Sequence, residues 1–120
     1  MKQFLAVFLG SADAMQSWND LPEAERASLM DQGVRAWYAW VDRYRDQIVF
    51  EGGPLGVTKS ISRSGITDIR NDMSAFMVMR AESHEAAAKL FEGHPHFTIF
   101  PGDSIEVMEC LPIPENRPES

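Results

Sequence analysis

The sequence predicts one α+β domain whose strands and helices follow the order βαββαβ. Residues 4–9 and Met73–Ala81 carry apolar side chains at both odd and even positions, as strands in the middle of a sheet do. A long segment between them has apolar residues at helical spacing, and a shorter helical pattern follows the second strand. The chain has 120 residues, 44% of them apolar, which suits a single globular core.

Composition excludes several classes of function. The net charge is −7 and the 11 basic residues are scattered, which argues against a nucleic-acid partner. A lone Cys110 cannot form an internal disulfide, and no cysteine and histidine cluster suggests a metal site, so we predict no cofactor and no metal.

The first residues allow two interpretations. Lys2, the apolar run at residues 4–9 and the small residues at 12–14 imitate a secretory signal. The same short run also fits a buried strand, and no run is long enough to cross a membrane. We therefore predict a cytoplasmic protein with no membrane contact.

The first helix is predicted to begin near residue 21. Asp20 and Glu23 have capping-box spacing, and Pro22 falls in the first turn, where proline is tolerated. Apolar residues then recur three and four positions apart, and tryptophans at this spacing pack in a core more often than they stack on a ligand. The main stripe is Met30, Val34, Trp37, Val41, Tyr44 and Ile48, with Leu29, Gly33, Ala36 and Trp40 beside it.

Residues 50–56 contain three glycines and one proline, a composition that fits neither a helix nor an uninterrupted strand. Glycine adopts positive φ and proline lacks an amide donor, so we expect a strand end that bends sharply. The bend is either a plain turn or a place where a ligand or second backbone approaches closely.

Besides the strand at Met73–Ala81, the second half of the chain supplies two strands and a helix. Residues 57–64 alternate loosely and are rich in hydroxyl groups, which predicts an edge strand ending in a turn at Ser64-Gly65. Ser83 is expected to cap a short helix that Gly93 ends. Residues 104–111 alternate cleanly and predict the last strand. The domain should therefore span residues 1–113, with an extended or disordered tail at 114–120.

This order is the ferredoxin-like arrangement, in which two helices cover one face of a four-stranded antiparallel sheet and the first and third strands are central. Two helices leave the other face open, yet Met77, Met79 and the second apolar row of the first strand require burial. We therefore expect a homodimer in which two sheets pack face to face as a dimeric α+β barrel.

Several segments in order resemble a known family. They are the opening strand, the helix start at residues 21–30, Gly52-Gly53-Pro54-Leu55-Gly56, Thr67-Asp68 and the closing strand at 104–109. Together they resemble the YCII-related proteins, also called the DGPF-domain family, over residues 1 to about 113. The resemblance implies a ferredoxin-like dimeric α+β barrel.

Two departures limit what the resemblance implies. Family members carry Thr-Asp-Gly-Pro-Phe where this chain has Thr67-Asp68 followed by Ile69-Arg70-Asn71. The His-Asp pair proposed for one branch places its histidine on the first helix, at a position that falls here on Ala36 or Trp37. Only Asp68 carries over, as a cleft carboxylate.

Six residues combine an aromatic or ionisable side chain with a position that suits a functional site. The candidate catalytic residues are Asp68 and His94, and the candidate ligand-binding residues are Trp37, Trp40, Arg80 and His96. His94 and His96 would bind a metal or transfer protons, or would cap the end of the preceding helix; the absence of a third nearby ligand favours capping. Arg80 would hold an anionic ligand inside the barrel, or pair with Asp68 or Glu109.

Two classes of function fit these residues. One is a small enzyme that acts on a cyclic or aromatic metabolite by proton transfer in the barrel cleft, as related barrels do. The other is a non-catalytic small-molecule-binding or regulatory module. The absent family signature and the absent His-Asp pair favour the second class or a divergent enzyme.

Overall fold

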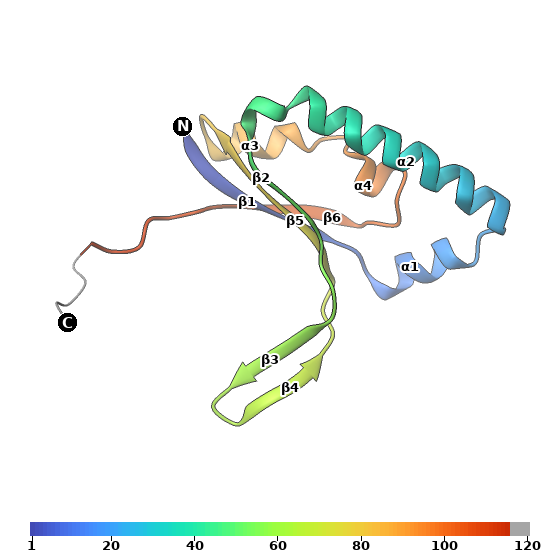
Figure 1. Ribbon diagram of the computed structural model, residues 1–120, viewed down its shortest axis with the longest axis horizontal. Coiled ribbons are helices and arrows are strands. Elements are labelled where there is room, and N and C mark those ends of the chain that lie inside the picture. Colours follow the sequence, from blue (N-terminus) through green and yellow to red (C-terminus); the bar gives the residue numbers. More distant parts are fainter. Residues whose placement is uncertain (116–120) are drawn as a thin grey trace.

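A four-stranded antiparallel sheet with the order β2-β5-β1-β6 forms the centre of the protein (Figure 1). The inner strands are β1 (Lys2–Leu9) and β5 (Met73–Ala81), and the edge strands are β2 (Ile48–Pro54) and β6 (Ser104–Glu109). This computed structural model describes residues 1–115. The first and third strands of the sheet are central, which confirms the predicted ferredoxin-like order.

The helices lie on one side of the sheet. They are α1 (Ala12–Asn19), α2 (Glu23–Arg43), the short 3₁₀ helix η1 (Arg45–Gln47), α3 (His84–Leu90) and α4 (Pro95–Thr98). The long α2 runs along the top of the view, and its N-terminal half extends past the sheet (Figure 1). Across residues 1–115, no helix combines the length and apolar character that a membrane-spanning segment needs.

The core lies between the sheet and these helices. In the strand register Phe4 pairs with Met79, Ala6 with Met77 and Phe8 with Ala75, and all six side chains are buried. Met77 and Met79 therefore belong to the helix-covered core. The expectation that they need a partner subunit is wrong, because their register with Phe4 and Ala6 turns them toward the helices.

The other sheet face, which we call the open face, carries the alternate residues of the same strands. Leu5, Val7, Phe76 and Val78 are half-buried there. Phe50 on the β2 edge is 58% exposed. Met108 on the β6 edge pairs with Leu5 and is 40% exposed. No described element of the chain covers this face.

The start of the first long helix differs from the expectation. Ser11 caps an additional helix, α1, by accepting a hydrogen bond from the Ala14 amide at 3.1 Å. Asp20 ends α1 through its own amide, and α2 begins after Pro22 without a side-chain cap. The predicted capping box of Asp20 and Glu23 is therefore wrong, because Asp20 is already used by the preceding helix.

The buried stripe of α2 is shorter than its sequence pattern. Gly33, Trp40 and Val41 are buried, whereas Met30 and Val34 are exposed. Met30 is 45% and Val34 is 41% exposed, so the close packing of α2 is concentrated at Trp40 and Val41, near its C-terminal end. At Gly33 the Phe100 ring occupies the space that a Cβ atom would need.

The glycine-rich segment forms the irregular end of edge strand β2. Its pairing with β5 shifts register between Ile48 and Phe50 and again between Phe50 and Gly53. Gly52 has φ +67°, and a side chain there would overlap the Phe76 carbonyl. Of the two readings of this segment, the structure supports close approach of a second backbone.

Residues 57–64 do not join the main sheet. β3 (Thr58–Ser62) pairs with β4 (Gly65–Ile69) in a separate hairpin that protrudes from the body (Figure 1). The turn lies at Arg63-Ser64, one residue before the predicted position, and Gly65 begins β4 with φ +116°. The predicted edge strand is wrong, because β2 already occupies the edge beside β5.

The end of the chain follows the expectation as far as it is described. Ser83 caps α3 by accepting from the Ala86 amide at 3.1 Å, and Gly93 follows the helix with φ +70°. Residues 116–120 of the predicted tail lie outside the described residues, and 114–115 have no helix or strand.

Candidate functional site

Four of the six predicted site residues meet in one aromatic cluster beneath α2. We use this name for Phe8, Trp37, Trp40, Phe91, His94 and His96. The His94 ring lies edge-on to Trp37 with 4.7 Å between ring centroids, and 4.8 Å from the Trp40 ring. The Phe8 ring packs edge-on against both histidine rings, with 5.2 Å between ring centroids in each pair. Elements far apart in sequence therefore surround His94 with aromatic rings.

His94 is fully buried and makes the N-cap of α4. Its Nδ1 accepts a hydrogen bond from the His96 amide at 3.0 Å, so the neutral ring carries its proton on Nε2. That Nε2–H has no hydrogen-bond partner among residues 1–115. Burial among the rings, with a smaller effect of His96, lowers the pKa of His94 from 6.5 to about 3. The imidazole is therefore neutral at physiological pH.

His96 is buried beside His94 and has a different partner. Its Nε2 lies 2.8 Å from the Leu9 carbonyl oxygen, which can only accept, so this nitrogen carries the proton. A side chain at Gly102 would overlap the His96 ring. Both rings therefore have structural partners, and within residues 1–115 no three His, Cys, Asp or Glu side chains form a metal site. Of the two histidines only His94 caps a helix, and that helix is the following α4 rather than the preceding α3; His96 lies within α4.

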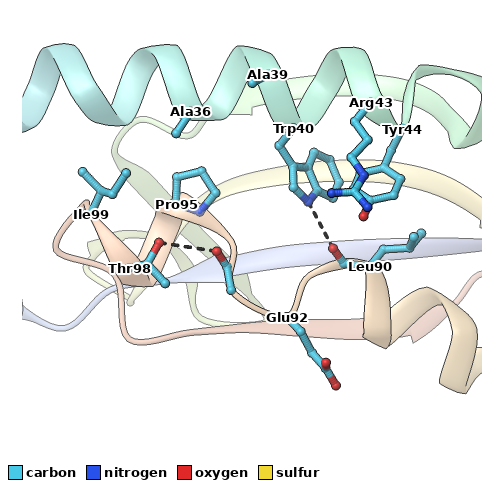
Figure 2. A pocket seen from close by; sticks show the side chains of 11 residues that line it. Ala36, Ala39, Trp40, Arg43, Tyr44, Leu90, Glu92, Pro95, Thr98 and Ile99 are labelled. Atoms are coloured by element: carbon cyan, nitrogen blue, oxygen red, sulfur yellow. Dashed lines mark hydrogen bonds between the residues drawn. The ribbon is translucent and has the colours of Figure 1, made fainter.

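A groove of about 400 Å³ lies beside the aromatic cluster, between α2 and the α3–α4 segment (Figure 2). Its lining is mostly apolar and includes Ala36, Ala39, Trp40, Tyr44, Pro95 and Ile99. The Trp40 and Tyr44 ring centroids are 5.0 Å apart. Trp40 donates its indole N–H to the Leu90 carbonyl at 3.1 Å, which holds this ring in place. Ala36 and Ala39 lie on α2 beside these rings, and their small side chains leave space in the groove (Figure 2).

Arg43 supplies the positive charge at this groove. Its guanidinium lies 5.2 Å from the centre of the Tyr44 ring, a cation–π contact. Among residues 1–115 it forms no ion pair. Glu92 also lines the groove, but its side chain points away from α2 (Figure 2). The groove therefore combines aromatic faces with one unneutralised cation.

Asp68 lies elsewhere. It stands on β4 in the protruding hairpin, and its carboxylate is 2.7 Å from Lys59 Nζ, with most of its surface in solvent. The structure does not bring Asp68 together with His94. No described side chain other than Lys59 pairs with it.

Arg80 lies at a third place, at the end of the open face. It donates two hydrogen bonds to the Asp46 carbonyl, at 3.0 and 2.8 Å, and pairs with neither Asp68 nor Glu109. It lines a hollow of about 460 Å³ with Met1, Gln3, Asp46 and Gln47. Arg80 therefore belongs to the open face rather than to the aromatic cluster.

Arg43 and α4 were missed by the sequence analysis. For α4 a signal was present, because Pro95 follows His94 directly, and proline is favoured at the first position of a helix. Arg43 resembled the other charged residues of α2, and only the fold places it beside Tyr44.

A solved structure shares this fold. The 5-chloro-2-hydroxyhydroquinone dehydrochlorinase TftG from Burkholderia phenoliruptrix AC1100, in complex with 2,5-dihydroxybenzoquinone, matches with a TM-score of 0.52. The match covers 88% of this chain and 90% of that one, at 19% sequence identity. No family model and no curated protein sequence matches the chain. The similarity establishes the α+β fold with its four-stranded antiparallel sheet.

Proposed function

We propose that this protein is a homodimeric, YCII-related α+β barrel that binds a small aromatic or cyclic metabolite carrying an acidic group. The groove beside the aromatic cluster supports the proposal most directly, because Trp40 and Tyr44 line it and Arg43 stands free at its edge. The ring faces suit a planar ligand, and the guanidinium suits a carboxylate or an ionised hydroxyl group.

The size of the groove agrees with such a ligand. About 400 Å³ falls within the range of small-molecule sites, roughly 300–1,000 Å³. The structural neighbour was solved with 2,5-dihydroxybenzoquinone, a planar ring with two hydroxyl groups. That compound is therefore a suitable first probe for this chain.

Recognition fits the geometry better than proton transfer does. Asp68 stands on the exposed hairpin, and His94 uses Nδ1 to cap α4 and stays neutral. Neither group is placed as a base at the groove. One observation favours the enzyme as a second candidate: the Nε2–H of His94 is a buried donor without a partner, which a ligand oxygen entering the cluster would satisfy.

A second copy of the chain is the proposed cover of the open face. Half-buried Leu5, Val7, Phe76 and Val78 form a contiguous apolar surface with the exposed Phe50. Apolar patches of this kind mark association surfaces, and two-fold packing of two such sheets buries both. The lone Cys110 agrees with a cytoplasmic location.

Ligand binding can be tested by isothermal calorimetry and thermal shift with 2,5-dihydroxybenzoquinone, benzoate and salicylate, using cyclohexanol as the uncharged comparison. A ligand at about 100 times its dissociation constant should stabilise the fold by about 2.7 kcal/mol, which raises the Tm by several degrees.

The Ala39→Phe variant fills the groove from an exposed position and should abolish this shift. Ala27→Phe adds the same ring to an exposed position of α2 outside the groove and should keep it. Equal binding by both variants would place the ligand elsewhere, and no binding of any acid would refute the proposal.

A further inference from the structure

The β3–β4 hairpin forms an arm that leaves the body of the protein (Figure 1). We call residues 57–70 the hairpin arm. Apart from Thr58 and Ser60, all of its residues are exposed. An isolated two-stranded hairpin is marginally stable in water, so an arm without any cover needs an explanation.

The arm has a defined direction because its base is tied to the body. Asn71 donates to Thr58 Oγ1 at 3.2 Å and accepts from the Met73 amide at 2.9 Å. Just inside the base, the Leu55 amide donates to the Ser74 carbonyl at 2.9 Å. The arm therefore continues the ribbon of β2 and β5, two strands that also carry the open face.

The two faces of the arm differ in character. Ile61 pairs directly with Ile66, and these side chains are 75% and 67% exposed. The neighbouring pair on the opposite face is Ser60 with Thr67. The Ile61–Ile66 pair shares its face with the Lys59–Asp68 ion pair, and Ile69 lies with Thr58 on the other face. The two isoleucines therefore form an exposed apolar spot that is bordered by a cross-strand ion pair.

The charge of the arm is opposite to that of the rest of the chain. It contains Lys59, Arg63 and Arg70 against Asp68, a net charge of +2, whereas the whole chain carries −7. The body alone is therefore at −9, and attraction favours an arm of one copy on the body of another.

We infer that the hairpin arm is a clasp that packs through its Ile61–Ile66 face on a second copy of this chain. The inference rests on the proposed homodimer and adds to it an element that holds the partner. Because the arm extends the strands of the open face, two-fold packing of the open faces carries each arm past the edge of its own body toward its partner. In a two-fold dimer this contact occurs twice, once for each arm.

The test combines sedimentation velocity with hydrogen exchange of the full chain. At micromolar concentration the wild type should be a dimer, with slow amide exchange in residues 58–69. Dilution below the dissociation constant should accelerate exchange in the arm to the rate of a free hairpin.

The double variant Ile61→Thr and Ile66→Thr keeps good strand formers and should raise the dimer dissociation constant tenfold or more. Ser60→Ala with Thr67→Ala changes the opposite face and should leave that constant within about twofold.

The outcomes separate this inference from the proposed homodimer. A stable wild-type dimer with unprotected arm amides, or one that the isoleucine substitutions leave unchanged, would overturn the clasp and keep the dimer. A wild-type monomer would overturn both. Protection of the arm at every dilution would mean that its own chain or another molecule covers it, which also overturns the clasp. Loss of ligand binding alone would affect neither.

Discussion

The two faces of the central sheet contain similar side chains but are covered in different ways. On the helix side, Phe4, Phe8 and Met79 are fully buried within one chain. On the open face, Phe76 is half-buried and Phe50 is mostly exposed. Adjacent residues of a single strand therefore experience either a complete core or an incomplete one, which indicates that the helices stabilise the monomer and that the open face is available for association.

Removing an aromatic ring from each face should give the largest contrast. Phe8→Ala leaves a cavity beside His94 and His96 and should lower the free energy of unfolding by about 3–5 kcal/mol. Phe50→Ala should cost less than about 1 kcal/mol of monomer stability but weaken self-association. Urea unfolding and sedimentation measure the two effects. Equal losses of stability would show that the faces do not differ as described.

Acid should weaken the helix side through His94. Its folded pKa of about 3 lies below the unfolded value of 6.5, so the unfolded chain binds a proton first as the pH falls. The stability that the neutral, buried imidazole gives the folded state is complete above about pH 6.5 and is lost toward pH 3. By about pH 4 the free energy of unfolding should have fallen by roughly 3 kcal/mol. Urea unfolding across this range measures how steeply the free energy of unfolding falls as the pH is lowered.

The His94→Asn variant isolates this contribution because asparagine can still cap α4 without titrating. It should be less stable at neutral pH but should lose this part of the pH dependence. His84→Asn, at the exposed start of α3, should keep the pH dependence of the free energy of unfolding that His94 causes. An unchanged slope in His94→Asn would contradict the assignment of a buried neutral imidazole.

The edge of the open face depends on a close backbone contact at Gly52. A methyl group there meets the Phe76 carbonyl at a positive φ, so Gly52→Ala should cost about 1–3 kcal/mol. Gly56→Ala has open space around its Cβ and should be neutral or slightly stabilising. Thermal unfolding compares the two. A neutral Gly52→Ala would mean that the edge of β2 adapts more easily than the rest of the sheet.

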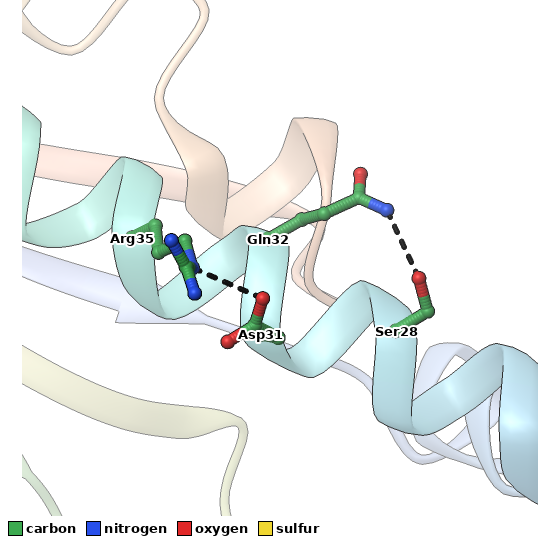
Figure 3. Close-up of polar contacts among 4 residues, drawn as sticks. All are labelled: Ser28, Asp31, Gln32 and Arg35. Atoms are coloured by element: carbon green, nitrogen blue, oxygen red, sulfur yellow. Dashed lines mark hydrogen bonds and ion pairs between the residues drawn. The ribbon is translucent and has the colours of Figure 1, made fainter.

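The smallest effect concerns charge at the groove. Arg43→Gln should weaken the binding of an acidic ligand by about 0.5–1 kcal/mol, because a partly solvated cation is lost. Arg35→Gln is the matched control: it removes the same charge from α2, where Arg35 pairs with Asp31 at 3.0 Å in solvent, beside a Ser28–Gln32 contact (Figure 3). Calorimetry compares the two. Equal losses would indicate a general charge effect rather than contact at the groove.

The fold was predictable because its strongest signals are local and periodic. Strands with apolar residues on both sides identified β1 and β5 as central, and the spacing of Trp37, Trp40 and Val41 identified the packed side of α2. Ser83 and Gly93 marked the ends of α3. Residues 57–64 were predicted as an edge strand of the main sheet because an exposed hairpin strand and an edge strand have the same local pattern.

The functional residues were less predictable. The two tryptophans and the two histidines were named as separate pairs, and the sequence did not indicate that they share one cluster. Asp68 was expected in a cleft, yet it lies on the arm beside Lys59. Contacts over long sequence distances depend on how α4 returns beneath α2, which has no local signature.

By itself, the sequence determined the two central strands, the long helix, the helix that Ser83 caps and the excess of negative charge, because each depends on residue type and spacing along the chain. Only the tertiary structure decided which apolar row the helices cover, that Met77 and Met79 belong to it, and that His94 is buried and neutral. The physical reason is that strand register and helix placement set burial, and burial in turn sets whether a side chain stabilises the core, titrates, or remains available to a ligand or a second chain.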